Sequence, residues 1–206
     1  MITKNNLLCT AILLTSMSAH AHDIHTNDTG GYVGGEIATN AVTTESSSYA
    51  YGYQTFSEKA SATAFGVYGG YNFTNWFGLE SAFTVTNLSK GTNGTSKLGA
   101  AVGSFSFTPK FTVRTSDSLS IYAKVGVAVT ALCDDNYNSD CWSGANGTAG
   151  FGLQFDLSQH AKLRFGYDVT KGSLTYKAKN SYSYSYYQEN LDLTQKRVSV
   201  SMHYQF

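Results

Sequence analysis

The last nine residues of the chain alternate strictly between polar side chains and apolar or aromatic ones. The apolar and aromatic residues take the even positions: Val198, Val200, Met202, Tyr204 and Phe206. Because successive side chains of a β-strand point to opposite faces, this strand has one apolar and one polar face. A strand between lipid and the polar interior of a closed barrel needs this pattern. The edge strand of a soluble sheet also shows it, so the segment alone leaves both readings open.

The N-terminus is organised like a cleaved export signal. Lys4 precedes the apolar run Leu7–Leu14, and Ala19 and Ala21 flank His20. Spanning a bilayer takes about 20 apolar residues, so this run is too short for an anchor helix. A small residue on each side of one intervening residue is the pattern of a cleavage site. We expect residues 1–21 to be a signal peptide and residues 22–206 to form one mature domain.

Composition narrows the class of protein. The chain has 20 Gly, 15 Tyr and 12 Phe but one Pro, and only 14% of it is charged. The 14 basic residues balance the 14 acidic ones, which argues against binding nucleic acid. No later segment is continuously apolar over the length of a membrane helix. An exported chain of this kind is either soluble or enters a membrane as a β-barrel.

Period-two alternation recurs along the whole mature chain. It marks eight runs, at residues 31–39, 62–73, 77–87, 98–114, 119–129, 146–156, 161–170 and 194–206. Short connections at 74–76, 115–118 and 157–160 alternate with long ones at about 40–61, 88–97, 131–145 and 171–190. Short turns at one end and long loops at the other are typical of transmembrane barrels. We therefore predict an all-β, eight-stranded, antiparallel up-and-down transmembrane barrel.

Two runs change phase. Leu98, Ala100 and Val102 are even, whereas the later apolar residues of the same run are odd; Leu191 and Leu193 are odd, whereas the last run is even. A β-bulge would reset the phase at each place. Alternatively, these residues lie in an extension of the strands beyond the lipid, where it is less constrained which side chains point outward. The sequence leaves both alternatives open.

Three segments carry a family resemblance. Residues 69–80 (GGYNFTNWFGLE), 119–126 (LSIYAKVG) and 152–167 (GLQFDLSQHAKLRFGY) resemble the strand-turn-strand blocks of the OmpA-like outer-membrane barrel family. The resemblance implies a monomer in the outer membrane, in contact with membrane lipid and lipopolysaccharide. It also implies insertion by the barrel assembly machinery, with Tyr204 and Phe206 as the C-terminal assembly signal. The long loops would then face away from the cell.

Several charged residues fall on the polar face of the predicted strands. The interior of an eight-stranded barrel is just wide enough for side chains, so charges there should pair. One interpretation is a static polar plug. The other, which the resemblance implies for some family members, is a pair that switches to open a narrow pore, here Glu80 with Lys110 and Arg164. The predicted lumen charge cluster consists of Glu36, Glu80, Lys110, Lys124, Arg164 and Asp168.

The long connections contain two further candidates. Cys133 and Cys141 are the only cysteines after signal cleavage, so an oxidising periplasm favours a disulfide between them. The aspartates nearby lack the spacing of a calcium loop, and we predict no metal and no cofactor. The 171–190 connection is rich in tyrosine, which suits recognition, although alternating Ser and Tyr also suit a hairpin that continues beyond the membrane. Its tyrosines are Tyr176, Tyr182, Tyr184, Tyr186 and Tyr187.

No catalytic set is apparent at the outward end of adjacent strands. His160 and His203 belong to the end of the barrel that carries the short turns, away from the outer leaflet where a lipid-modifying enzyme would act. Omptin-type proteases resemble larger, ten-stranded barrels. We therefore predict a non-enzymatic barrel for envelope structure and surface contact or adhesion, with a host or cell-surface ligand as partner. The alternatives are a narrow gated pore and a lipid-modifying enzyme.

Overall fold

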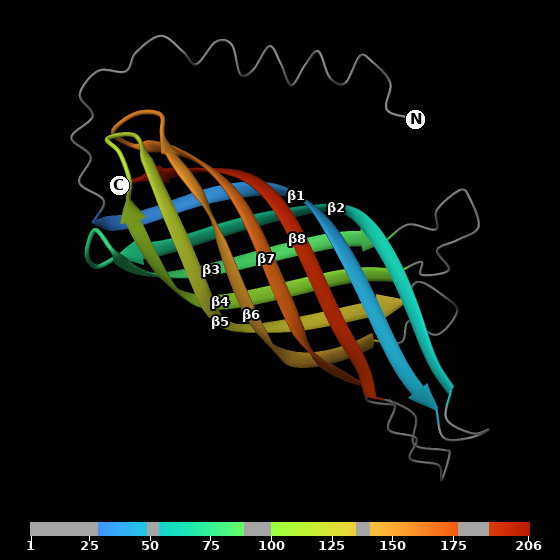
Figure 1. The fold of residues 1–206 in the computed structure, drawn as a ribbon. Coiled ribbons are helices and arrows are strands. Elements are labelled where there is room, and N and C mark those ends of the chain that lie inside the picture. Colours follow the sequence, from blue (N-terminus) through green and yellow to red (C-terminus); the bar gives the residue numbers. More distant parts are fainter. Residues whose placement is uncertain (1–28, 49–53, 89–99, 135–140, 177–189) are drawn as a thin grey trace, which may run out of the picture.

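A computed structural model of the chain describes residues 29–48, 54–88, 100–134, 141–176 and 190–206. Consecutive strands pair antiparallel, and β1 also pairs with β8, which closes the sheet into a barrel (Figure 1). This confirms the predicted eight-stranded meander. Among the described residues, no helix has the length and apolar character needed to cross a membrane. The strands are β1 (Gly30–Ser48), β2 (Gln54–Asn72), β3 (Phe77–Leu88), β4 (Ala100–Arg114), β5 (Leu119–Asp134), β6 (Cys141–Asp156), β7 (Ala161–Tyr176) and β8 (Asn190–Gln205).

The three predicted short turns are present and lie at one end of the barrel, together with the start of β1 and the end of β8 (Figure 1). We call this the turn end. In each turn a backbone N–H donates to the carbonyl of the first residue of the following strand, at 2.9–3.0 Å. Side-chain oxygens add support: the N–H of Phe77 donates to Thr74 Oγ1, and that of Ala161 donates to Ser158 Oγ, both at 3.0 Å. Local turn chemistry therefore fixes this end of the molecule.

The opposite end departs from the prediction, because much of the predicted loops is strand. Residues 40–48 and 54–61 belong to β1 and β2, which are 19 residues long, and all the other strands except β4 also gain residues at the same end. Beyond the lipid-facing residues the outward positions become polar, for example Thr43, Lys59 and Lys171. The hydropathy alternation therefore fades there, while the backbone pairing continues.

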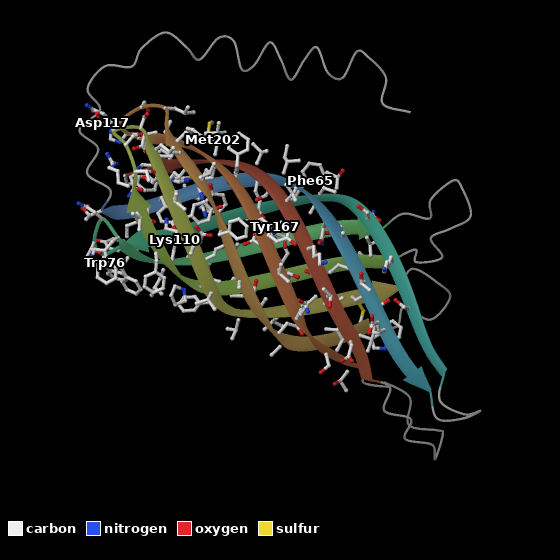
Figure 2. The ribbon with its side chains drawn as sticks, in the orientation of Figure 1. Phe65, Trp76, Lys110, Asp117, Tyr167 and Met202 are labelled. Carbon is white, nitrogen blue, oxygen red and sulfur yellow. A yellow bond between two sulfur atoms is a disulfide. The ribbon has the colours of Figure 1, made fainter. Side chains whose placement is uncertain are left out.

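Large apolar side chains cover the outside of the barrel. Phe65 and Met202 project away from the ribbon in Figure 2. At the turn end, the Trp76 ring stacks with Phe111 at 6.4 Å between centroids, as expected of an interfacial aromatic girdle. The predicted lipid faces are thus on the outside. Each strand contributes such outward residues, and one example per strand, each 39–61% exposed, is Val33, Phe65, Phe83, Phe105, Val127, Phe151, Phe165 and Met202.

The phase changes do not arise from bulges. Pairing of β3 with β4 keeps a single register up to Leu88 opposite Ala100, and pairing of β1 with β8 does so up to Ser46 opposite Leu191. The bulge alternative is therefore wrong at these places; Leu98 lies outside the described residues. Val102 and Leu193 instead point into the barrel and join an apolar layer at the end opposite the turns. This layer consists of Val42, Ala60, Leu88, Val102, Leu132, Leu174 and Leu193, none more than 8% exposed.

Inward tyrosines lie directly opposite glycines. Three such pairs occur, Tyr32–Gly70, Tyr68–Gly34 and Tyr122–Gly152. In an interior this narrow, a large ring needs the space that a missing side chain leaves. A β-carbon on Gly152 would clash with the backbone oxygen of Phe165 on β7 and would lie 2.6 Å from Tyr122 Oη, so neither the neighbouring strand nor the ring could stay in place.

This geometry predicts that Gly152→Ala destabilises the barrel by about 1–3 kcal/mol, because it overpacks the interior. The matched control is Gly103→Ala, since a β-carbon on Gly103 meets no atom within 4 Å. Urea unfolding of both variants in detergent, followed by the gel shift between folded and heated protein, measures the difference. Equal midpoints for the two variants would contradict the close packing of Tyr122 and β7 around Gly152.

Candidate functional site in the barrel interior

Glu80 on β3 is the centre of the interior charges. Its side chain is 2% exposed and faces the barrel axis. Arg164 donates to both carboxylate oxygens, at 2.7 and 3.4 Å, and Lys124 Nζ donates to Oε1 at 3.2 Å. Tyr32 Oη adds a hydrogen bond to Oε2 at 3.0 Å. Four donors from three side chains compensate for the cost of burying this carboxylate.

The ion pairs continue from Glu80 along the inside of the sheet. Lys124 Nζ also lies 3.1 Å from Asp168 Oδ1, and Arg197 Nη2 lies 2.9 Å from the other oxygen of that carboxylate. Arg197 Nη1 reaches Glu36 Oε1 at 3.2 Å. Cations and anions thus alternate and balance in number. We call these six residues the interior charge network: Arg164, Glu80, Lys124, Asp168, Arg197 and Glu36.

Aromatic rings hold Arg164 in place. Its guanidinium carbon lies 4.3 Å from the ring centroid of Tyr122 and 4.8 Å from that of Tyr68. Such contacts are favourable for a guanidinium and restrict its motion. Tyr68 Oη in turn lies 3.1 Å from His203 Nδ1 and 3.3 Å from Ser201 Oγ. The arginine that binds Glu80 is therefore fixed by a second set of buried side chains.

Lys110 does not take the predicted place beside Glu80. It lies directly opposite Lys124 on the paired strands β4 and β5, and both side chains face inward. Two like charges at opposite positions repel, so the two ammonium groups diverge. Lys124 reaches Glu80, whereas Lys110 Nζ lies over the Tyr32 ring, 4.2 Å from its centroid. Figure 2 shows Lys110 within the barrel, toward the turn end.

Two features of the interior were not predicted. Arg197 links Asp168 to Glu36, and its odd position on the last strand is the signal that would have found it. A second charge group lies at the turn end, where Asp156 contacts Arg114 at 3.1 Å and Lys162 at 3.3 Å. Alternation identifies the inward face of a strand, but it does not select which inward charges meet.

A small polar cavity separates the interior charge network from the apolar layer. Its volume of about 20 Å³ is large enough for one water molecule. The apolar layer lies beyond it, toward the end opposite the turns. Network, cavity and apolar layer therefore follow one another along the axis of the barrel. The cavity is lined by Thr84, Ser104, Ser106, Ala128, Thr148, Asp168, Thr170, Gln195 and Arg197.

The remaining predicted site residues lie away from this network. Cys133 and Cys141 stand directly opposite each other on β5 and β6, with their Sγ atoms 2.11 Å apart, at disulfide distance. Phe206 is exposed and its backbone N–H donates to Gly31 O at 2.9 Å. Tyr204 packs edge to face against the Phe206 ring. Tyr176 ends β7, and the predicted recognition residues Tyr182, Tyr184, Tyr186 and Tyr187 lie outside the described residues.

The two histidines among the described residues pack against tyrosine rings. His160 lies in the turn between β6 and β7, where Nδ1 is 3.0 Å from Gln205 O and the ring stacks on Tyr204. His203 is buried between Tyr32 and Tyr68. Within the described part of the chain, no group of three or more His, Cys, Asp or Glu residues is placed to hold a metal ion.

The fold and its apolar exterior define a small transmembrane barrel, and comparison with known proteins assigns its family. The model of the outer membrane protein beta-barrel domain matches residues 7–206, so the chain belongs to that family and is an outer-membrane protein. The predicted outer-membrane location is thereby confirmed. A comparison with curated protein sequences gives no match.

Solved structures share the architecture at low sequence identity. OprG from Pseudomonas aeruginosa is 13% identical, with a TM-score of 0.61 over 89% of this chain and 99% of OprG. Neisserial surface protein A is 12% identical, with a TM-score of 0.58 over 84% of this chain and 97% of that chain. The protease OmpT from Escherichia coli is 7% identical, with a TM-score of 0.52 over 92% of this chain and 100% of OmpT. A barrel of this general kind thus occurs both in an enzyme and in surface proteins.

The interior charge network predicts a large effect of neutralising Glu80. Glu80→Gln removes the carboxylate that Arg164 binds and leaves Lys124 with Asp168 alone, which should cost about 3–5 kcal/mol of folding free energy. Val127→Ala is the control, because Val127 is 60% exposed on the lipid side and its truncation leaves no cavity in the interior. Urea unfolding in detergent micelles compares the two variants. Equal destabilisation would show that Glu80 does not anchor the interior.

Proposed function

We propose that this protein is a sealed, non-enzymatic outer-membrane barrel, a monomer that acts in envelope structure and surface contact. The filled interior is the observation that carries the proposal. The side chain of Glu80 is 2% exposed within the interior charge network, and every member of the apolar layer is at most 8% exposed. Buried side chains joined by ion pairs in this way make a rigid stem between the two ends of the barrel.

The length of the strands supports a role at the cell surface. About 9–11 residues of a tilted strand cross the hydrocarbon region, whereas β1 and β2 have 19 residues each. The remaining 8–10 residues amount to about 26–33 Å of strand, which at a tilt of about 45° carries the strand ends some 20 Å beyond the lipid. With the turn end in the periplasm, the connections 49–53, 89–99, 135–140 and 177–189 are held outside the cell. The proposed Cys133–Cys141 disulfide would tie one of these hairpins together.

A gated pore is less well supported. Ion flow would need the Arg164–Glu80 pair to separate and the apolar layer to part in the same state, and separation of a buried ion pair alone costs several kcal/mol. A lipid-modifying enzyme is also less well supported. His203 is enclosed by Tyr32 and Tyr68, and His160 lies at the turn end, away from the proposed outer leaflet. Insertion by the barrel assembly machinery would use Tyr204 and Phe206, at the periplasmic end of β8.

The proposal predicts that surface recognition and insertion into the outer membrane depend on different parts of the chain. Replacing residues 177–189 by a two-residue Asn-Gly turn should preserve assembly, because loop closure entropy depends weakly on loop length. It should abolish binding of expressing cells to host cells or matrix, because it removes the Tyr-rich segment. Deletion of Phe206 should have the opposite effect and reduce the amount of folded protein in the outer membrane. Heat-shift gels of membrane fractions measure assembly, and cell-binding assays measure contact.

A length-matched variant separates the tyrosines from the loop itself. Tyr182, Tyr184, Tyr186 and Tyr187 are changed together to Ser, which keeps the number of residues between β7 and β8. Surface contact should be lost in this variant as well. Normal contact in both loop variants would refute the recognition role of this connection.

A further inference from the structure

Three lysines gather on the outside of four neighbouring strands. Lys59 on β2, Lys171 on β7 and Lys196 on β8 are all exposed on the outward face, and these strands are neighbours in the order β2, β1, β8, β7. The pairing places two of the lysines in one row across the sheet. Lys59 is opposite Thr43, Thr43 is opposite Thr194, and Thr194 is opposite Lys171. We call the three lysines together with Thr43 and Thr194 the lysine face.

On β7 and β8 the lysine face begins where the apolar exterior ends, whereas on β2 the outward residues Thr63 and Ser61 lie between Phe65 and Lys59. On β8, Val198 is 59% exposed on the lipid side, and the next outward residue is Lys196. A strand rises about 3.3 Å per residue, so the Lys196 backbone lies about 7 Å along the strand from that of Val198. The row that contains Lys59 and Lys171 is one outward position further. Lysine side chains at this height place their ammonium groups at the level of lipid headgroups.

The size of the face suits a large phosphorylated headgroup. Neighbouring strands are about 4.8 Å apart, so Lys59 and Lys171, three strands apart, are separated by about 14 Å. Lys196 lies between them, one row closer to the lipid, opposite Ala41 and Val169. The hydroxyls of Thr43 and Thr194 add donors within the row. A headgroup with more than one phosphate on a sugar can contact all three ammonium groups.

The positive charge is confined to one side of the barrel. Among the described residues, the outward positions of β3, β4, β5 and β6 carry no Lys, Arg, Asp or Glu. Lysines that served only solubility would have no reason to avoid half of the circumference. The local concentration instead indicates a partner of opposite charge at this height on this side.

The carboxylates closest to the lysine face form no ion pair with it. Glu45 and Asp192 lie directly opposite each other, one row further from the lipid. Within the described part of the chain, Lys59, Lys171 and Lys196 take part in no ion pair. The three ammonium groups are thus available to anions that approach from the side of the membrane.

We propose that the lysine face binds the phosphate groups of lipopolysaccharide in the outer leaflet. The inference rests on one part of the proposed function, namely that the end opposite the turns faces out of the cell. It does not depend on what the loops recognise. Lipopolysaccharide bound there would fix the rotation of the barrel in the leaflet, with β7, β8, β1 and β2 against the glycolipid.

The test is a titration of the folded, full mature protein in detergent with purified lipopolysaccharide, with binding read by native mass spectrometry. The triple variant K59Q/K171Q/K196Q should bind at least about tenfold more weakly than wild type, because it removes all three cations. The charge-preserving variant K59R/K171R/K196R should bind like wild type. The variant E45Q/D192N, which removes two nearby anions, should bind as well as wild type or better.

Further measurements in the same titration identify the source of the phosphate. Dephosphorylated lipopolysaccharide should bind wild type as weakly as the intact glycolipid binds the Gln variant, and added salt should weaken wild-type binding. Unchanged affinity in the Gln variant would overturn the proposal, as would equal binding of the dephosphorylated glycolipid. Displacement by equimolar inorganic phosphate would also overturn it, because the site would then be one for free phosphate. Heat-shift gels verify that each variant is folded. The binding of lipopolysaccharide would stay the same if the loops proved to have no role in surface contact.

Discussion

The narrow interior of an eight-stranded barrel is the constraint on which the rest of this structure depends. Hydrocarbon offers no partner to backbone N–H and C=O groups, so the sheet must close, as it does through the pairing of β1 with β8. Closure at eight strands leaves an interior that side chains just fill. Every inward residue must therefore fit beside its neighbours, and every inward charge must find a partner. The four hydrogen bonds to Glu80 are the clearest instance of this requirement.

Other features follow from the same constraint. Tyr122 is accommodated because Gly152 stands opposite, and its ring then packs against Arg164. Lys110 and Lys124 stand opposite each other with like charges, so one binds carboxylates while the other lies on an aromatic ring. Toward the far end, the described inward side chains form the apolar layer. The interior is therefore filled by two kinds of packing along the axis, namely ion pairs in the charge network and apolar contacts in the apolar layer.

Alternation in the sequence was sufficient to predict the barrel, the number of strands and the three short turns. It correctly assigned Val127 to the outside and Glu80 to the inside, because side chains on a strand must take opposite faces. It failed where one face loses its hydrophobic character. Beyond the lipid, Lys59 and Lys171 still alternate in position but no longer in hydropathy, so the strand ends there were predicted as loops. At Val102 and Leu193 the alternation predicts a change of phase, whereas both are apolar residues that face inward.

The partners within the interior could not be predicted from alternation. Arg197 was missed and Lys110 was assigned to Glu80, because alternation gives the face of a residue but not its height along the axis. Height depends on the register between strands and on the direction each long side chain takes, and both become visible only in three dimensions. The same limit applied to the lysine face, whose row across four strands depends on the register of three separate strand pairs.

Single-channel recording of the folded protein in planar lipid bilayers tests the sealed interior most directly. Protein that shows the heat shift on gels would be added to one side of the bilayer at low concentration. We expect a flat baseline without conductance steps, because the interior charge network and the apolar layer occlude the axis in series. Reproducible conductance steps from the wild-type protein would contradict the sealed interior and would favour a pore gated at the Arg164–Glu80 pair.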